Sequence, residues 1–145
     1  MSGDLLDGLA RWAALLGHGV YRPDTPYAAG EVAIVLGDVV PQPEELLALR
    51  VYGGAEPDSR LPYSEPSVQW RVRGTADELS SRTRALALWD DLHGAGPVEL
   101  PGGVFVMSVI CLQADPIPLG RDDAGRHEHT VNTRIDYVRE SSHRG

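Results

Sequence analysis

The chain has 145 residues, of which 42% are apolar and 23% charged, a length and composition typical of one globular domain. Its 13 basic residues are all arginine, and its 21 acidic residues give a formal net charge of −8. That balance argues against a nucleic-acid-binding module and against docking on an anionic membrane. A single cysteine excludes an internal disulfide framework, and no apolar run reaches the ~18 residues of a membrane span. We expect one domain over residues 1–140 and a disordered tail at 141–145.

The first half of the chain predicts one helix followed by strands. Residues 4–17 are amphipathic, and Ser2 or Asp4 can cap the start of this helix. The expected inward stripe is Leu5, Leu6, Leu9, Trp12, Ala13 and Leu16. Strands are expected at 20–21, at 32–36, which is apolar enough to be buried on both faces, and at 46–52. Residues 53–66 are rich in Gly, Pro, Asp and Ser, and predict a long exposed connection.

The second half predicts a half-buried strand, a second helix and a hairpin. Residues 68–73 alternate between apolar and polar side chains. Thr75 and Glu78 form a capping box for a helix that ends at Gly94. Its expected inward residues are Leu79, Leu86, Trp89 and Leu92, joined by Ala76, Thr83 and Ala85. A Gly102-Gly103 turn joins strands 98–100 and 104–114, residues 115–126 form a polar loop, and 130–138 is the last strand. The fold class is therefore α+β, with a mostly antiparallel or mixed sheet flanked by two helices.

One cluster of residues could carry metal chemistry. His127 and His129 share a face of a strand, and Asp122 and Asp123 precede them, so the four side chains could ligate a metal. The alternative is a solvated loop running into a strand, which the lack of a third His or Cys at metal spacing favours. Cys111 lies in an apolar strand, where a free cysteine behaves as a small buried hydrophobe more often than as a nucleophile.

Other polar residues are candidates for protein–protein contact. Gln69, Arg71 and Arg73 share one face of a strand, and they either meet a partner's carboxylates or are simply exposed to solvent. The long polar segments 53–66 and 115–128 are expected to be contact surfaces, because loops of that length are usually functional or disordered. The three tryptophans fit the apolar patterns and are expected in the core.

Several segments together resemble the tail terminator (minor capsid or minor tail) proteins of long-tailed bacteriophages, especially those infecting GC-rich actinobacteria. The resemblance begins with the helix Leu5–Leu16 and the Tyr21-Arg22-Pro23-Asp24 that follows it. It continues through strand 31–37, the segment 67–74 (SVQWRVRG) with its helix, and 118–126 (PLGRDDAGR). A final strand containing Asn132 and Arg134 completes it, and the absence of lysine fits a GC-rich phage or prophage.

The resemblance implies a structural protein of the virion without cofactor, metal or catalytic residues. Such proteins form a hexameric ring on the completed tail tube, stop its polymerisation and present a surface to the head-completion, or neck, proteins. DNA passes through the ring without specific binding. The expected partners are other copies of the chain, the tail tube protein and a neck protein, in the virion and, during assembly, in the host cytoplasm. Two alternatives remain open: another head–tail joining (stopper or completion) protein of similar fold, and a metal-dependent enzyme using His127 and His129.

The sequence also offers candidates for the contacts between subunits. A ring needs heterologous contacts, in which one patch meets a different patch on the next subunit. Residues 1–66 hold 10 acidic and 4 basic residues and residues 67–145 hold 11 and 9, so the two halves differ in charge. Acidic side chains also suit the wall of a channel through which DNA slides, because they do not bind its phosphates. The expected interface residues are Gln69, Arg71, Arg73, Arg121, Asp122, Arg126 and His127.

Overall fold

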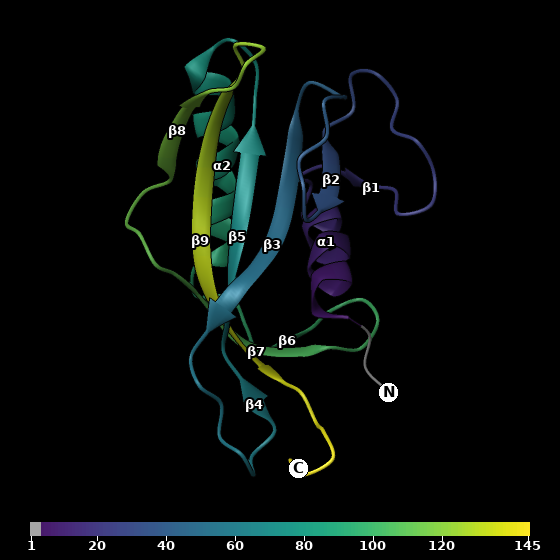
Figure 1. Ribbon diagram of the computed structural model, residues 1–145, viewed down its shortest axis with the longest axis vertical. Helices are drawn as coiled ribbons and strands as arrows, with labels where there is room; N and C mark the ends of the chain where they lie inside the picture. The colour runs from purple at the N-terminus through teal and green to yellow at the C-terminus, as the bar shows by residue number, and fades with distance from the viewer. Residues whose placement is uncertain (1–3) are drawn as a thin grey trace.

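The computed structural model describes residues 4–145, which form two helices and nine strands (Figure 1). The first half contains α1 (Leu5–Leu15), β1 (Val20–Tyr21), β2 (Ala33–Leu36), β3 (Leu46–Gly54), β4 (Tyr63–Ser64) and β5 (Pro66–Arg73). The second half contains α2 (Glu78–Leu92), β6 (Val98–Glu99), β7 (Phe105–Cys111), β8 (Ile117–Arg121) and β9 (His127–Val138). None of the helices in this part of the chain is both long enough and apolar enough to cross a membrane.

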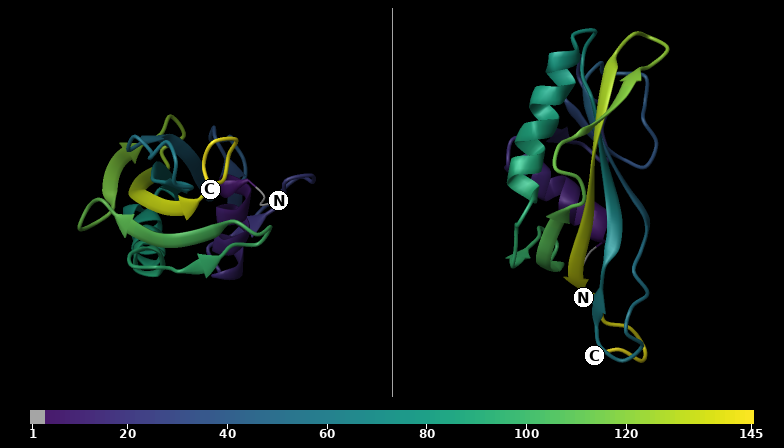
Figure 2. Two further views of the ribbon diagram at one scale, coloured as in Figure 1. Left: turned by 90° about the horizontal axis from the view of Figure 1, so that it is seen from below. Right: turned by 90° about the vertical axis from the view of Figure 1, so that its left-hand side faces the viewer.

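The strands form one mixed sheet, which confirms the α+β class. Its order is β1-β2-β3-β5-β9-β7-β6, and β4 and β8 also pair with β9. The pairs β1–β2 and β2–β3 are parallel, whereas all the other pairs are antiparallel. Both helices lie on one face of the sheet, and seen along its length the sheet curls around them (Figure 2). The other face carries no helix among the described residues and is called the open face below.

Helix α1 is capped as expected, because Asp4 accepts a hydrogen bond from the Asp7 backbone N–H at 3.0 Å. The alternative cap, Ser2, lies outside the described residues. Leu5, Leu9 and Ala13 are buried as the amphipathic pattern predicts. Leu16, predicted to face inward, is exposed because it is the C-cap residue beyond the last helical turn.

Helix α2 begins later than predicted, and its buried face is only partly the predicted one, since Ala85 and Leu92 are buried as expected. Asp77, not Thr75, is the N-cap, and its carboxylate accepts from the Leu79 backbone N–H at 3.1 Å. The buried residues are Ser81, Ala85, Leu88 and Leu92, spaced as one face of a helix. Leu79 is 64% exposed, and Leu86 and Trp89 are only half-buried. Because the polar Ser81 faces inward, the buried face of α2 differs from the face that its large apolar side chains mark.

Two of the predicted loops are partly strand. The connection 53–66 contains the end of β3, the two residues of β4 and the start of β5. The segment 115–128 contains β8, and β9 begins at His127 rather than at Thr130. The strand pattern was hidden here because β8 includes a proline and a glycine. At the chain's end, the Arg144 guanidinium donates to the carbonyls of Leu61 and Tyr63, so the tail folds against the β3–β4 connection.

The core lies between the sheet and the helices, around the fully buried Trp70. The Trp70 indole donates to the Thr133 hydroxyl at 3.0 Å, and this hydroxyl donates to the Val68 carbonyl at 3.0 Å. A smaller cluster on the open face contains Ala33, Leu46 and Ala48. Both faces of β2 and β3 are therefore buried where these strands begin, as expected for β2, although Leu36 at its end is exposed.

A second buried polar pair joins α2 to β9. The Ser81 hydroxyl and His129 Nδ1 lie 2.7 Å apart, and both side chains are buried. Burial lowers the pKa of His129 below its ordinary value of 6.5. The His129 imidazole is thus neutral in the folded chain at a pH where the same side chain in the unfolded chain already takes up a proton.

This linkage predicts a loss of stability in mildly acidic solution. The pKa of His129 is lower in the folded than in the unfolded chain. Its contribution to the free energy of unfolding is therefore complete above pH 6.5 and declines as the pH falls below that value. We expect His129→Asn to lower stability at pH 7.5 but to reduce the further loss between pH 7.5 and 5.5, measured by urea unfolding. His143→Asn, at an exposed position, is the control and should lose stability as the wild type does. An identical pH dependence of the wild type and His129→Asn would contradict the assignment.

Candidate interaction surface

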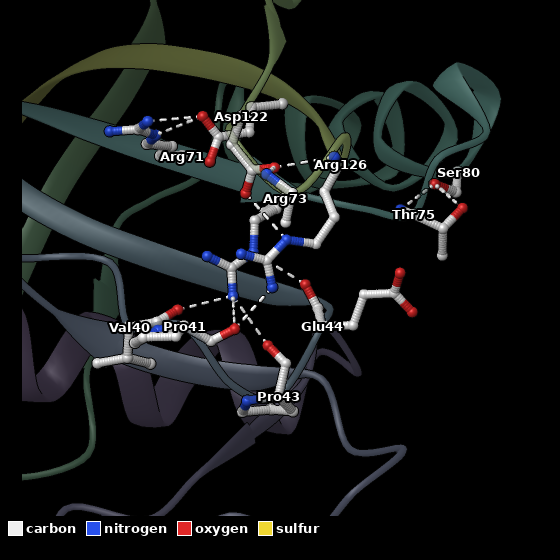
Figure 3. Close-up of polar contacts among 12 residues, drawn as sticks. Val40, Pro41, Pro43, Glu44, Arg71, Arg73, Thr75, Ser80, Asp122 and Arg126 are labelled. Atoms are coloured by element: carbon white, nitrogen blue, oxygen red, sulfur yellow. Dashed lines mark hydrogen bonds and ion pairs between the residues drawn. The ribbon is translucent and has the colours of Figure 1, made fainter.

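Most of the predicted interface residues gather at one end of the sheet. They come from the C-terminal half of β5 and from the β8–β9 hairpin, because Arg73 is paired with Glu128 and Arg121 with His127 across the strands. Figure 3 shows Arg71, Arg73, Asp122 and Arg126 near one another, beside the loop that connects β2 to β3. This loop, residues 37–45, is called the β2–β3 loop below.

Arg71 finds its carboxylate within the same chain. Its guanidinium lies on the open face and donates to Glu128 Oε1 at 2.6 Å, where the Glu128 side chain is buried and that of Arg71 is 37% exposed. Gln69, two residues earlier on the same face, is half-buried and lies opposite Asn132. Arg71 therefore serves first to compensate a buried charge.

Arg73 is not on an exposed face, which corrects the sequence-based expectation. The residue is 1% exposed, although the alternation of the strand places it beside Gln69 and Arg71. Its guanidinium donates to the carbonyls of Val40 at 2.7 Å, Pro43 at 2.9 Å and Glu44 at 2.9 Å. A longer bond reaches the Pro41 carbonyl at 3.3 Å. Burial lowers the pKa of Arg73, and the backbone dipoles of the β2–β3 loop replace the water that the charge has lost.

Arg126 holds the same loop from the β8–β9 turn. Its Nη1 donates to the Pro41 carbonyl at 2.6 Å, and its Nε donates to Asp122 at 2.9 Å. Burial alone would raise the pKa of Asp122, but hydrogen bonds from the backbone and side chain of Arg126 outweigh burial and place this pKa below its ordinary value. Two arginines, one from β5 and one from the β8–β9 turn, therefore converge on the Pro41 carbonyl and fix the β2–β3 loop.

The other predicted residues are less buried. Arg121, the last residue of β8, is exposed, and His127 is half-buried at the start of β9. Within residues 4–145, Arg121 forms no ion pair. The structure thus separates the residues that organise the loop from Arg121, which is exposed and available to a partner.

The geometry gives no support to the metal hypothesis. His129 is turned to Ser81, and no cluster of three or more His, Cys, Asp or Glu side chains suited to a metal occurs in the described part of the chain. Cys111 is buried, and burial raises the pKa of its thiol to about 11. The buried-hydrophobe interpretation of Cys111 is thereby confirmed, because a protonated thiol is a poor nucleophile.

A groove that sequence reasoning missed lies beside β2. It has a volume of about 560 Å³ and is lined by Pro26, Tyr27, Ala29, Val35, Val40, Gln42 and Pro43. We call it the β2 groove. One wall is the β2–β3 loop held by Arg73 and Arg126, and the other is the loop before β2. The Tyr27 hydroxyl donates to the Ile34 carbonyl and accepts from the Arg22 backbone N–H. The only signal in the sequence is the unusual number of apolar residues in two proline-containing loops.

A larger groove of about 710 Å³ runs between the end of α1 and α2. Leu47 and Val72 of the sheet form part of its lining, and Arg84 and Asp91 of α2 form another part. The Arg84 guanidinium also donates to the Arg73 carbonyl at 3.1 Å. This bond links α2 to the strand that carries the buried arginine.

The role of Arg73 can be tested by removing its donors. We expect Arg73→Met to lower the free energy of unfolding by at least about 2 kcal/mol, because several acceptors lose their partner at once. Hydrogen exchange at residues 37–45 should also become faster. Arg50→Met is the matched control on the neighbouring strand, since Arg50 is exposed and pairs only with the exposed Asp38, and it should change stability by no more than about 0.5 kcal/mol. Equal effects of the two substitutions would show that Arg73 does not anchor the loop.

Comparison with known proteins identifies the family. No curated protein and no solved structure matches the chain. A family model described as bacteriophage tail terminator protein matches residues 14–139, which include every strand and α2, whereas most of α1 and the last six residues lie outside the match. This match extends over most of the chain and agrees with the resemblance seen in the sequence. The chain is therefore a structural protein that belongs to the bacteriophage tail terminator family.

Proposed function

We propose that this chain forms a hexameric ring that caps the tail tube and ends its polymerisation. The same ring would present its outer side to the head-completion, or neck, protein, and the phage DNA would pass through its lumen. The observation that carries the proposal is the family match over residues 14–139. The protein would then act in the virion tail, after assembly in the host cytoplasm.

The shape of the molecule supports a ring. The two long edges of the sheet differ: β8 lies on one side of β9, and β1 and β2 lie at the other end of the strand order (Figure 1). A subunit whose opposite sides differ makes heterologous contacts, and these close into a ring when the rotation between neighbours allows it.

The charge distribution supports a lumen that does not retain DNA. Eight of the arginines pair with carboxylates of the same chain, namely Arg11, Arg22, Arg50, Arg71, Arg82, Arg84, Arg126 and Arg134. Arg73 and Arg144 donate to carbonyls. Few cations therefore remain to bind phosphate, and the surplus of acid would let DNA slide. We propose that part of this acid lines the lumen.

The mass of the protein in solution and the length of tail tubes test the proposal. Light scattering over a range of protein and salt concentrations should detect a species of six chains, either alone or on short tubes of the cognate tail tube protein. Adding the chain to polymerising tube protein should shorten the tubes in proportion to its concentration, because each ring blocks an end. Arg73→Met, with a loosened loop, should shorten them less.

The opposite result would be equally informative. A chain that binds neck proteins but leaves tube length unchanged would overturn the terminator role and favour the alternative of another head–tail joining protein. Mapping charge on the assembled ring would overturn the proposed lumen if the inner wall proved basic.

A further inference from the structure

We propose that the β8 edge of one copy of this chain docks into the β2 groove of the next copy, with Leu119 entering the groove and Arg121 facing Glu44. This contact rests on the proposed ring and names the surfaces that would build it. Three features of the structure support this contact: a preformed apolar groove, an exposed apolar residue on the uncovered edge, and complementary charges at the same end of the molecule.

The groove is ready to receive a side chain. Six of its seven lining residues are apolar or aromatic, and its volume lies within the ~300–1,000 Å³ that drug-sized ligands fill. Its walls are fixed by Arg73, Arg126 and the Tyr27 hydroxyl, whose partners are backbone atoms. Because the walls are held before any partner arrives, binding costs little ordering entropy.

The β8 edge offers the matching protrusion. Among the described strands β8 pairs only with β9, so its other side is open, and Leu119 in this strand is 47% exposed. Pro118 has no backbone N–H, and the register shifts between Pro118 and Gly120 so that Leu119 has no partner on β9, which makes the edge poorly suited to pair with another strand. Insertion of a side chain is therefore favoured over extension of the sheet.

Each surface has an exposed charge of opposite sign beside it, and the exposed Asp123 also lies two residues after Arg121. Arg121 ends β8, whereas Glu44 follows the groove residues Gln42 and Pro43, and Asp24 precedes Pro26. All three are exposed, and within residues 4–145 none of them forms an ion pair. In Figure 1 the end of β8 and the start of β3, which the β2–β3 loop leads into, both lie toward the top of the molecule. A neighbour placed side by side would bring these charges together.

This placement also disfavours a closed pair. In a twofold dimer each β8 would have to reach the other copy's groove at the same time, but β8 and β2 lie toward opposite edges of the sheet (Figure 1). The contact is therefore heterologous, and a series of such contacts closes into a ring when the rotation between neighbours allows it.

Disulfide trapping tests the contact directly. In the double variant Leu119→Cys with Val40→Cys, oxidation should produce a ladder of linked chains that ends at six. Neither single variant should give more than traces of linked chains. The native Cys111 is buried and will not compete. The double variant Leu119→Cys with Leu61→Cys is the matched control, because Leu61 is similarly exposed but lies on the β3–β4 connection.

A charge exchange gives a second, independent test of the contact. We expect Arg121→Glu and Glu44→Arg each to raise the protein concentration needed for assembly by about tenfold or more, through repulsion across the interface. The double variant should recover most of this loss. Thermal unfolding of the single variants should match that of the wild type, since both residues are exposed and unpaired in the chain.

The outcomes separate this contact from the proposed function. A six-chain species that forms with no ladder from Leu119→Cys and Val40→Cys, and with no rescue by the charge exchange, would overturn the contact and leave the ring. A chain that forms no oligomer alone or on tail tubes, and does not limit tube length, would overturn both. Linking of Leu119→Cys to the tube or neck protein, rather than to Val40→Cys, would overturn the contact and show that another partner covers the β8 edge.

Discussion

The buried guanidinium of Arg73 is the interaction on which this end of the molecule depends. A cation at a position that is 1% exposed would be very costly without partners, and here four carbonyls of one loop supply them. Arginine suits the task because its planar group carries five donors and stays charged. The loop in return loses its freedom, and Arg126 adds a second bond to the Pro41 carbonyl.

Buried polar groups also fix the register of the sheet. A shift of one residue between β5 and its neighbours would move Arg73 away from the carbonyls and carry Trp70 to the open face. It would also break the bond from the Trp70 indole to Thr133. Buried polar groups thus specify the register of the central strands, while the apolar residues between them supply most of the stabilisation. The bond from Arg84 to the Arg73 carbonyl ties α2 to the same arrangement.

The sequence predicted elements with a strong periodic pattern and missed those defined by distant contacts. Helix α1, the hairpin of β6 and β7 and the alternation of β5 follow from local patterns, and the family follows from short motifs spread along the chain. The exposure of Arg73 could not be predicted, because alternation indicates a side of the sheet but not whether a loop covers that side. Strand β8 was missed because proline and glycine mark turns locally, whereas here β9 supplies the pairing. The β2 groove depends on two loops brought together by tertiary contacts, so no local pattern contains it.

A buried arginine that shapes an exposed groove has a consequence for assembly. The cost of ordering the β2–β3 loop is met during folding of the single chain, so it does not reduce the affinity between chains. A ring that closes only when several weak contacts form together gains most from this arrangement, because any ordering cost would recur at every contact around the circle. In the proposed ring, the contact would then remain small and polar at its rim, and the acidic surface would keep copies apart until a tube end gathers them. We therefore propose that Arg73, buried beneath the β2–β3 loop, sets how readily the two surfaces meet.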